Sequence, residues 1–212
     1  MRERARELVT VPVMVADEVW VVTSTVALLA PSGHRGDRLR AAALPEGRAA
    51  EFLAGRGLLR ELLTAVRPRL AGRDVVTDAG GKPRLRECSE VGVSVSHSGG
   101  TVAAAVAVGR ELGVDVQQPP ETVSATLARR LLGEHARDLT ELTAAGAARE
   151  VAWVWTAQEA CAKACGEGLR GRPWSIDVPP GARAGRWGDY RWVALREHSA
   201  IPLSCAFARR RT

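Results

Sequence analysis

Aromatic residues and lysine are scarce in this sequence. Only one Tyr and two Phe occur among its 212 residues, and aromatic residues of all kinds make up 4%. A surface that stacks the bases of single-stranded nucleic acid therefore has few candidate side chains. The net charge is +6, yet the Lys and Arg residues are dispersed rather than gathered in a long basic run. We expect no nucleic-acid partner, and the positive charge instead suits a polyphosphate ligand or an acidic protein.

The sequence also lacks long apolar runs and paired cysteines. The longest apolar stretch near the N-terminus, Val19 to Ala30, is about 12 residues long and includes Thr and Ser, so it is too short and too polar to span a bilayer. Four cysteines occur, and none belongs to a CxxC pair or has a His at metal-ligand spacing. Free cysteines of this kind are usually small buried side chains. With no secretion signal, we expect reduced thiols in a cytoplasmic protein that contacts no membrane.

Several catalytic motifs are absent as well. The sequence contains no HExxH or GxSxG segment, and no GxxxxGK followed by Ser or Thr. Residues 55–60 lack the GxGxxG spacing of a dinucleotide-binding turn. The function must therefore be inferred from shorter and less specific segments.

Strands and helices follow one another in a mixed order. Apolar residues recur at helical spacing from Glu46 to Val66 and again from Arg149 to Cys165, which predicts two long helices. Further helices are predicted at 37–44, 121–132 and 134–145, and strands at 9–15, 19–29, 75–76, 84–85, 91–100, 112–116, 174–178, 190–195 and 203–207. Residues 102–108 fit either a buried strand or a helix. This order favours an α+β (mixed α/β) fold over a regular doubly wound sheet.

The segment from Trp155 to Lys163 contains the first candidate residues. Thr156 followed three residues later by Glu159 is a capping box, which gives Glu159 a purely structural interpretation at the start of a helix. Glu159 and Lys163 are four residues apart and share one helix face. They form either a solvated ion pair or a carboxylate and an ammonium that hold a metal and a phosphate together. In the second case the positive end of the helix would also favour an anion.

Asp115 is a charged residue inside the apolar segment 112–116. A buried carboxylate without partners is unfavourable, so Asp115 needs a cation or hydrogen-bond donors unless this strand is half exposed. Gln117 is two residues further along and faces the same way. A second polar segment, residues 96–100, ends a strand in a Gly-rich turn of the kind that offers backbone N–H groups to phosphate. Its His97, taken alone, is more often a structural residue.

The order of these segments resembles that of the phosphopantetheinyl transferases, of the type that activates surfactin synthetase. The series consists of GRGLLR at 55–60, GKP at 81–83, SVSHSG at 94–99, LGVDVQ at 112–117 and WTAQEACAKACGEGL at 155–169. The resemblance extends from residue 48 to residue 207. Its most specific feature is the separation between GVD and the W-T-x-x-E-A-x-x-K segment.

The resemblance implies a fold of two similar halves related by a pseudo-twofold axis, residues 1–109 and 110–212, with the site between them in a monomer. Such enzymes transfer the 4′-phosphopantetheine group of coenzyme A to a serine of an acyl or peptidyl carrier protein. They release adenosine 3′,5′-bisphosphate. The implied partners are coenzyme A and an acidic carrier protein of fatty acid, polyketide or nonribosomal peptide synthesis, which a +6 enzyme would attract.

The same resemblance implies roles for individual residues. Asp115 and Glu159 would bind Mg²⁺, or Mn²⁺, and Lys163 would neutralise charge on the transferred phosphoryl group. Glu159, or a metal-bound water that it orients, would take the proton of the carrier serine. The residues implied in coenzyme A binding are Arg56, Lys82, Pro83, Ser96, His97 and Lys163. Positioning and charge neutralisation are what phosphoryl transfer requires of a protein.

Two positions depart from the family pattern. Gln117 stands where many relatives have Glu, and Gln158 stands where the motif usually has Lys. We expect Gln117 or a water at the third metal position. If the usual Glu and Lys form an ion pair, their joint loss is electrically neutral and predicts a hydrogen bond between Gln117 and Gln158. The departures also allow an alternative function, a coenzyme A-binding relative with reduced or lost transferase activity.

Overall fold

The computed structural model describes residues 11–208, which form two antiparallel sheets. The first sheet has the order β1-β2-β6-β5-β4-β3 and the second the order β7-β10-β9-β8. The first sheet comprises β1 (Val13–Ala16), β2 (Val19–Thr25), β3 (Val75–Thr77), β4 (Pro83–Leu85), β5 (Cys88–Ser98) and β6 (Thr101–Val108). The second comprises β7 (Leu112–Val116), β8 (Ala184–Trp187), β9 (Tyr190–Ala194) and β10 (Leu203–Ala208). With its helices, this arrangement confirms the predicted α+β fold.

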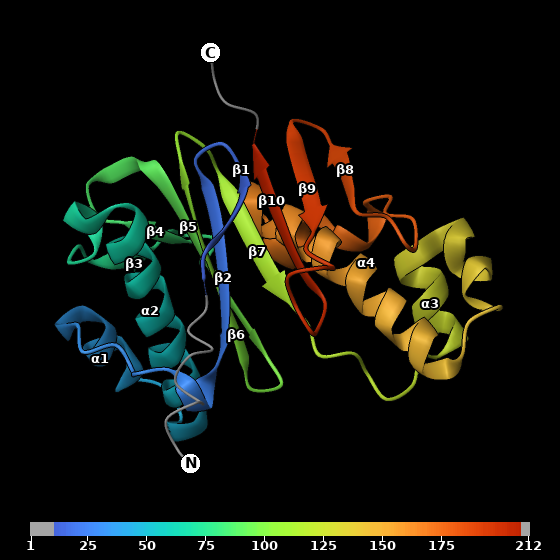
Figure 1. Ribbon diagram of the computed structural model, residues 1–212, viewed down its shortest axis with the longest axis horizontal. Helices are drawn as coiled ribbons and strands as arrows, with labels where there is room; N and C mark the ends of the chain where they lie inside the picture. Colours follow the sequence, from blue (N-terminus) through green and yellow to red (C-terminus); the bar gives the residue numbers. More distant parts are fainter. Residues whose placement is uncertain (1–10, 209–212) are drawn as a thin grey trace.

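Four α-helices cover the sheets: α1 (Arg35–Ala41), α2 (Glu46–Val66), α3 (Ala125–Leu132) and α4 (Ala144–Cys165). Short 3-10 turns lie at Val26–Leu28, Pro68–Leu70, Gly133–Leu139, Gly168–Gly171 and Pro173–Ser175. Figure 1 shows the strands of both sheets between α2 on one side and α4 on the other. Within the described part of the chain, no helix combines the length and the apolar character needed to cross a membrane.

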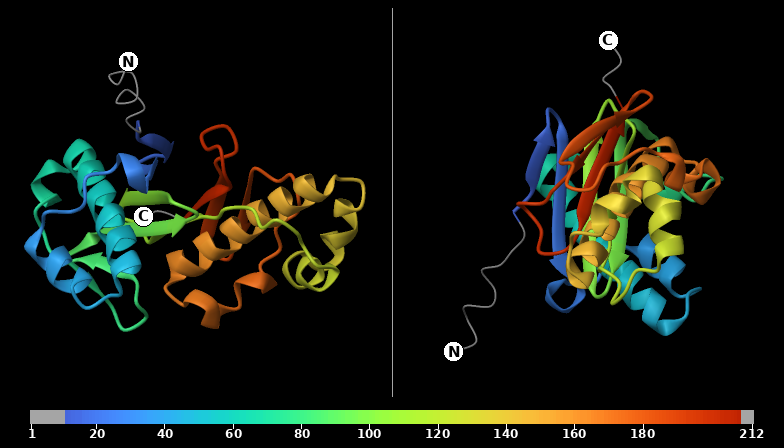
Figure 2. Two further views of the ribbon diagram at one scale, coloured as in Figure 1. Left: turned by 90° about the horizontal axis from the view of Figure 1, so that it is seen from below. Right: turned by 90° about the vertical axis from the view of Figure 1, so that its right-hand side faces the viewer.

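The alternation of side chains along β6 explains how the layers pack. From Val102 onward, every second residue of β6 packs against α2, and the intervening alanines face the second sheet. Both faces are buried, so this run shows no polar alternation, and the segment that the sequence left open is a strand. The views in Figure 2 agree with this order of layers, which is α2, first sheet, second sheet, α4.

In β7 the same alternation of side chains determines which residues face α4. Leu112, Val114 and Val116 pack into the core between the sheets. Gly113 and Asp115 therefore face the opposite way, toward α4. The strand order is thus what places a carboxylate between a sheet and a helix.

Helix α4 begins earlier than the sequence indicated. Its N-cap is Thr143, whose Oγ1 accepts a hydrogen bond from the Gly146 N–H at 3.1 Å. Thr156 lies inside the helix, where its Oγ1 donates to the Trp153 carbonyl at 2.9 Å. The predicted capping box is therefore wrong, and Glu159 stands in the C-terminal part of α4 rather than at a positive helix end. The sequence pattern divides this segment because residues 144–148 are all alanine or glycine and show no apolar periodicity.

Near the C-terminus, two further expectations on strands differ from the structure. A strand was predicted at 174–178, but Pro173–Ser175 forms a 3-10 turn. β8 was not predicted, because a short edge strand that contains Gly and Arg carries little pattern. The strand predicted from Val9 begins at Val13 among the described residues, and Val9 itself lies outside them. The two-half division at residue 109 and the pseudo-twofold axis stay predictions.

Candidate active site

Three serines on one face of β5 hold the edge of β7. The Oγ atoms of Ser94, Ser96 and Ser98 accept hydrogen bonds of 3.0, 3.4 and 2.9 Å from the backbone N–H of every second residue, beginning at Val114. The S-x-S-x-S spacing in the SVSHSG segment therefore joins the first sheet to the second. The segment predicted as a phosphate-binding turn is strand up to Ser98, and only its two glycines form the turn.

Gly113 allows α4 to lie directly on β7. A Cβ atom at this position would lie 2.2 Å from the Ala160 carbonyl oxygen and 2.5 Å from the Ala164 nitrogen. Real Cβ atoms do not approach backbone atoms so closely, so the crossing requires glycine. Asp115, two residues further along β7, is consequently brought to the face of α4 that carries Lys163.

Asp115 is 6% exposed and is held by the donors that its burial requires. Lys163 donates from Nζ to Asp115 Oδ1 at 2.6 Å and to Ser96 Oγ at 3.0 Å. Ser96 in turn donates to the same Oδ1 at 2.8 Å. Among residues 11–208, the hydrogen bonds found for the Asp115 carboxylate all reach Oδ1, which leaves Oδ2 available to a further ligand.

The surroundings of the Glu159 carboxylate differ from those of Asp115. Its Oε1 is buried and has no hydrogen-bond partner in the described part of the chain. Burial, together with the negative charge of Asp115, raises the pKa of the Glu159 carboxyl, although Lys163 opposes this shift. Two carboxylates that repel each other across a partly buried site, one with an orphaned oxygen, fit a divalent cation. Mg²⁺ is commonly bound by one or two carboxylates together with waters and substrate phosphates.

Gln117 and Gln158 do not form the predicted hydrogen bond. Gln117, at the end of β7, donates to the Gln118 carbonyl at 2.9 Å. Gln158 is fully buried, and its Nε2 donates to the carbonyls of Leu131 and Ile176 at 2.8 and 2.9 Å. The prediction is wrong because Gln158 lies on the side of α4 turned away from β7, where it links α3 and the segment after α4.

The two lysines of the sequence line one small cavity beside this site. The cavity has a volume of about 170 Å³ and is bounded by Gly80, Gly81, Lys82, Pro83, Ser94, Val95, Lys163, Gly166 and Gly168. Lys82 is 7% exposed, and its Nζ contacts the Glu111 carboxylate and donates to the Ala164 carbonyl at 2.6 Å. Burial lowers the pKa of Lys82, while Glu111 opposes the shift. Glu111 was not among the predicted site residues, and its only sequence signal is its place directly before an apolar strand.

His97 faces α2, on the other side of β5 from Ser96. Its Nδ1 lies 3.4 Å from Glu51 Oε2. Burial lowers the pKa of His97, against the effect of Glu51, and the charges of Lys163 and Asp115 also act on it. Among the described residues its ion pair is with Glu51 of α2, and no hydrogen bond or ion pair joins His97 to Asp115 or Lys163.

Arg56 belongs to a separate buried cluster between α1 and α2. It is 5% exposed, lies 3.9 Å from Asp37, and its guanidinium stands 5.0 Å from the centre of the Phe52 ring. Burial lowers its pKa to about 10, although Asp37 opposes the shift. Its Nη1 has no hydrogen-bond partner among the described residues. The structure does not join Arg56 to the Asp115 and Lys163 pair by any direct contact.

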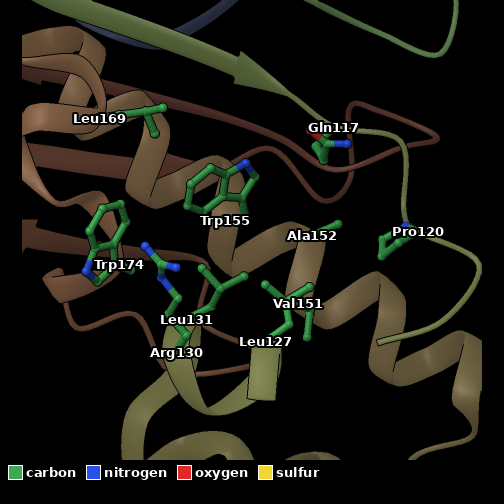
Figure 3. A pocket seen from close by; sticks show the side chains of 10 residues that line it. All are labelled: Gln117, Pro120, Leu127, Arg130, Leu131, Val151, Ala152, Trp155, Leu169 and Trp174. Atoms are coloured by element: carbon green, nitrogen blue, oxygen red, sulfur yellow. The ribbon is translucent and has the colours of Figure 1, made fainter. Parts of the chain in front are cut away.

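An apolar pocket of about 480 Å³ adjoins the site near Gln117. Its walls come from α3, α4 and the segments on either side of them (Figure 3), with Gln117, Pro120, Leu127, Arg130, Leu131, Val151, Ala152, Trp155, Leu169 and Trp174 as lining residues. Trp155 is one turn before Glu159 on α4, and the Arg130 guanidinium lies 4.4 Å from the centre of the Trp174 ring. Sequence reasoning missed this pocket because its residues come from separate segments.

Two carboxylates, an ammonium group and a neighbouring apolar pocket lie in one region, a combination that suits an anionic ligand with an apolar group. Comparison with known families then identifies the class of protein. Residues 37–107 match the 4′-phosphopantetheinyl transferase N-terminal domain, and residues 111–193 match the 4′-phosphopantetheinyl transferase superfamily. The chain belongs to the 4′-phosphopantetheinyl transferase superfamily, and its matched domains are those of a transferase of phosphopantetheine. No curated protein matches the chain.

Proposed function

We propose that this protein transfers 4′-phosphopantetheine from coenzyme A to a serine of an acyl or peptidyl carrier protein, as enzymes of the surfactin-synthetase-activating type do. It would act as a cytoplasmic monomer and release adenosine 3′,5′-bisphosphate. The observation that carries the proposal is that Lys163 binds Asp115 while Glu159, one turn earlier on α4, has a buried Oε1 with no partner among residues 11–208. A bound cation would compensate the two carboxylates, and a pyrophosphate would compensate the cation and the ammonium.

Asp115 and Glu159 would hold Mg²⁺ or Mn²⁺, which supplies charge neutralisation at the pyrophosphate. Lys163, held by Asp115, Ser96 and the Val114 carbonyl, would exchange one of these hydrogen bonds for the phosphate that is transferred. The carrier serine forms a new bond from Oγ to that phosphorus, and the bond to the nucleotide phosphate breaks with its electron pair. Glu159, or a metal-bound water that it orients, would accept the serine proton.

The apolar pocket beside Glu159 is the proposed place of the transferred arm. Phosphates and nucleotide would lie toward His97, Lys82 and Lys163, where the polar groups are. The pantetheine arm must leave the pyrophosphate in another direction, and the pocket at Trp155 begins one helical turn from Glu159. Its largely apolar walls suit the methyl groups and the thiol of the arm.

Mass spectrometry of apo carrier proteins incubated with coenzyme A and this protein tests the proposal. With Mg²⁺ we expect each accepted carrier to gain one phosphopantetheine on a serine, and none when the metal is chelated. Glu159→Gln should abolish the gain, whereas Glu61→Gln, the same change at an exposed glutamate of α2, should not. If coenzyme A binds but no carrier in a broad panel gains mass, the protein is the binding relative without transferase activity, and the proposal is wrong.

A further inference from the structure

Lys82 ties the C-terminal end of α4 to the start of β7. Its ammonium donates to the Ala164 carbonyl at 2.6 Å and contacts the Glu111 carboxylate. Ala164 directly follows Lys163 in α4, and Glu111 directly precedes β7, which carries Asp115. The last carbonyls of a helix have no partner within the helix, and a buried cation there is favourable. One ammonium group thus joins the two elements whose side chains meet in the site.

The partners of Lys82 are themselves fixed. Glu111 Oε1 accepts a hydrogen bond from Arg84 Nη1 at 3.1 Å, so both of its oxygens are bound. Arg84 Nε donates to Asp78 Oδ2 at 3.0 Å. Asp78 Oδ1 accepts the backbone N–H groups of Gly80 and Lys82, each at 3.0 Å, which closes the turn of the GKP segment. The network therefore holds Lys82 from its backbone as well as from its ammonium.

The geometry points to Lys82 and Glu111 as a positioning pair that keeps Lys163 in register with Asp115. This inference rests on the proposed transferase function. Lys163 Nζ is 2.6 Å from Asp115 Oδ1, and it must reach the reacting phosphate from this position. A displacement of about 1 Å in such a group lowers rates by up to about 100-fold. Gly113 packs against Ala160, Lys163 and Ala164 in the same part of α4, so Lys82 secures the last turn of the helix directly beside this crossing.

The competing role for Lys82 is direct contact with the nucleotide of coenzyme A. An ammonium has three donors, and two of them are used on protein groups here. A positioning role predicts a loss of kcat, while a ligand contact predicts a rise in KM for coenzyme A. Lys82→Met and Glu111→Gln separate the two, because only the lysine lines the cavity beside Lys163.

Steady-state kinetics with an apo carrier protein is the first experiment. We expect kcat to fall by about 10- to 100-fold in Lys82→Met and in Glu111→Gln, with KM for coenzyme A changed by less than about twofold. The double variant should be no slower than Lys82→Met alone, because both changes break the same contact between Lys82 and Glu111. If Lys82→Met raises KM for coenzyme A and Glu111→Gln leaves the kinetics unchanged, the positioning role is wrong.

Hydrogen exchange of the free protein is the second experiment and needs no activity. Amides 163–168, at the end of α4, should exchange faster in Lys82→Met and in Glu111→Gln than in the unchanged protein. Arg86→Met is the matched control, because it removes a nearby cation that pairs with Asp74 outside this network. Unchanged exchange in both test variants overturns the inference. A protein that transfers nothing but shows the faster exchange would contradict the proposed function and leave the connection between α4 and β7 supported.

Discussion

Glu159 carries a charge that its neighbours only partly compensate. Its pKa is raised in the folded protein, chiefly by burial and also by Asp115, so folding favours its protonated form. The stabilisation from a raised carboxyl pKa is present below the unfolded pKa and is lost as pH rises through the folded pKa. Without metal, Glu159→Gln should therefore resist urea better than the unchanged protein at about pH 7.5, and the two should converge toward about pH 4.

Added Mg²⁺ provides the internal control for this prediction. If Glu159 holds the cation as proposed, Mg²⁺ should raise the urea midpoint of the unchanged protein at neutral pH more than that of Glu159→Gln. Glu61→Gln should respond to Mg²⁺ like the unchanged protein, because Glu61 is an exposed residue of α2. Equal stabilisation of all three proteins would show that Glu159 does not bind the metal.

The sequence was sufficient for some of these residues and insufficient for others. A single carboxylate in an apolar strand requires partners, so the partners of Asp115 could be expected, and the structure supplies Lys163 and Ser96. The direction of Gln158 could not be predicted, because the rotation of α4 about its axis is set by the glycine crossing with β7. Glu111 could not be predicted as a site residue, because a charged residue before a strand is common and its partner Lys82 lies 29 positions away in the sequence.

The crossing of β7 and α4 depends on Gly113 having no side chain. Gly113→Ala would place a Cβ 2.2 Å from a backbone oxygen, which no rotation of a side chain can relieve. We expect a loss of about 1–3 kcal/mol in the free energy of unfolding, measured by urea denaturation, as for other overpacked cores. Gly47→Ala is the control, because a Cβ there meets nothing within 4 Å and alanine favours the helix α2. Similar effects of the two changes would mean that the crossing tolerates a side chain.

Trp155 belongs to α4 but serves the apolar pocket rather than the core alone. If the pantetheine arm lies in this pocket, Trp155→Ala should weaken coenzyme A binding by about tenfold, equal to about 1.4 kcal/mol. Adenosine 3′,5′-bisphosphate has no such arm and should bind both proteins equally in calorimetry. An equal loss of affinity for both ligands would instead indicate that Trp155 maintains the fold of the site.

Among the elements, those with strong periodicity were predicted well. Helix α2 has the bounds Glu46–Val66 that its apolar spacing indicated, and β7 has the predicted bounds Leu112–Val116. Elements without a pattern were not: the start of α4 consists of small residues, and β8 is a short, partly exposed edge strand. Apolar periodicity indicates which face of a helix or strand is buried. It therefore cannot predict an element in which no single face is apolar.

The two sheets share one core, and this decides how the whole molecule unfolds. Residues of β2 and β6 from the first sheet pack with residues of β7 and β10 from the second. The serines of β5 and the lysine of the GKP turn add further connections between the two parts. Separating residues 11–108 from residues 112–208 would expose this common apolar face on both sides. We therefore expect the chain to unfold in a single cooperative transition.

The cysteines provide one probe for each core. Cys88 belongs to the core under α2, Cys205 to the core between the sheets, and Cys161 to the core under α4. All four thiols of the chain are free, and burial raises the pKa of Cys161 to about 12, so thiolate reactivity is low in the folded protein. Pulsed alkylation across a urea gradient, read by peptide mass spectrometry, should give the same midpoint at the three positions. A lower midpoint for Cys88 than for Cys161 would show that the two sheets unfold separately and that the shared core does not couple them.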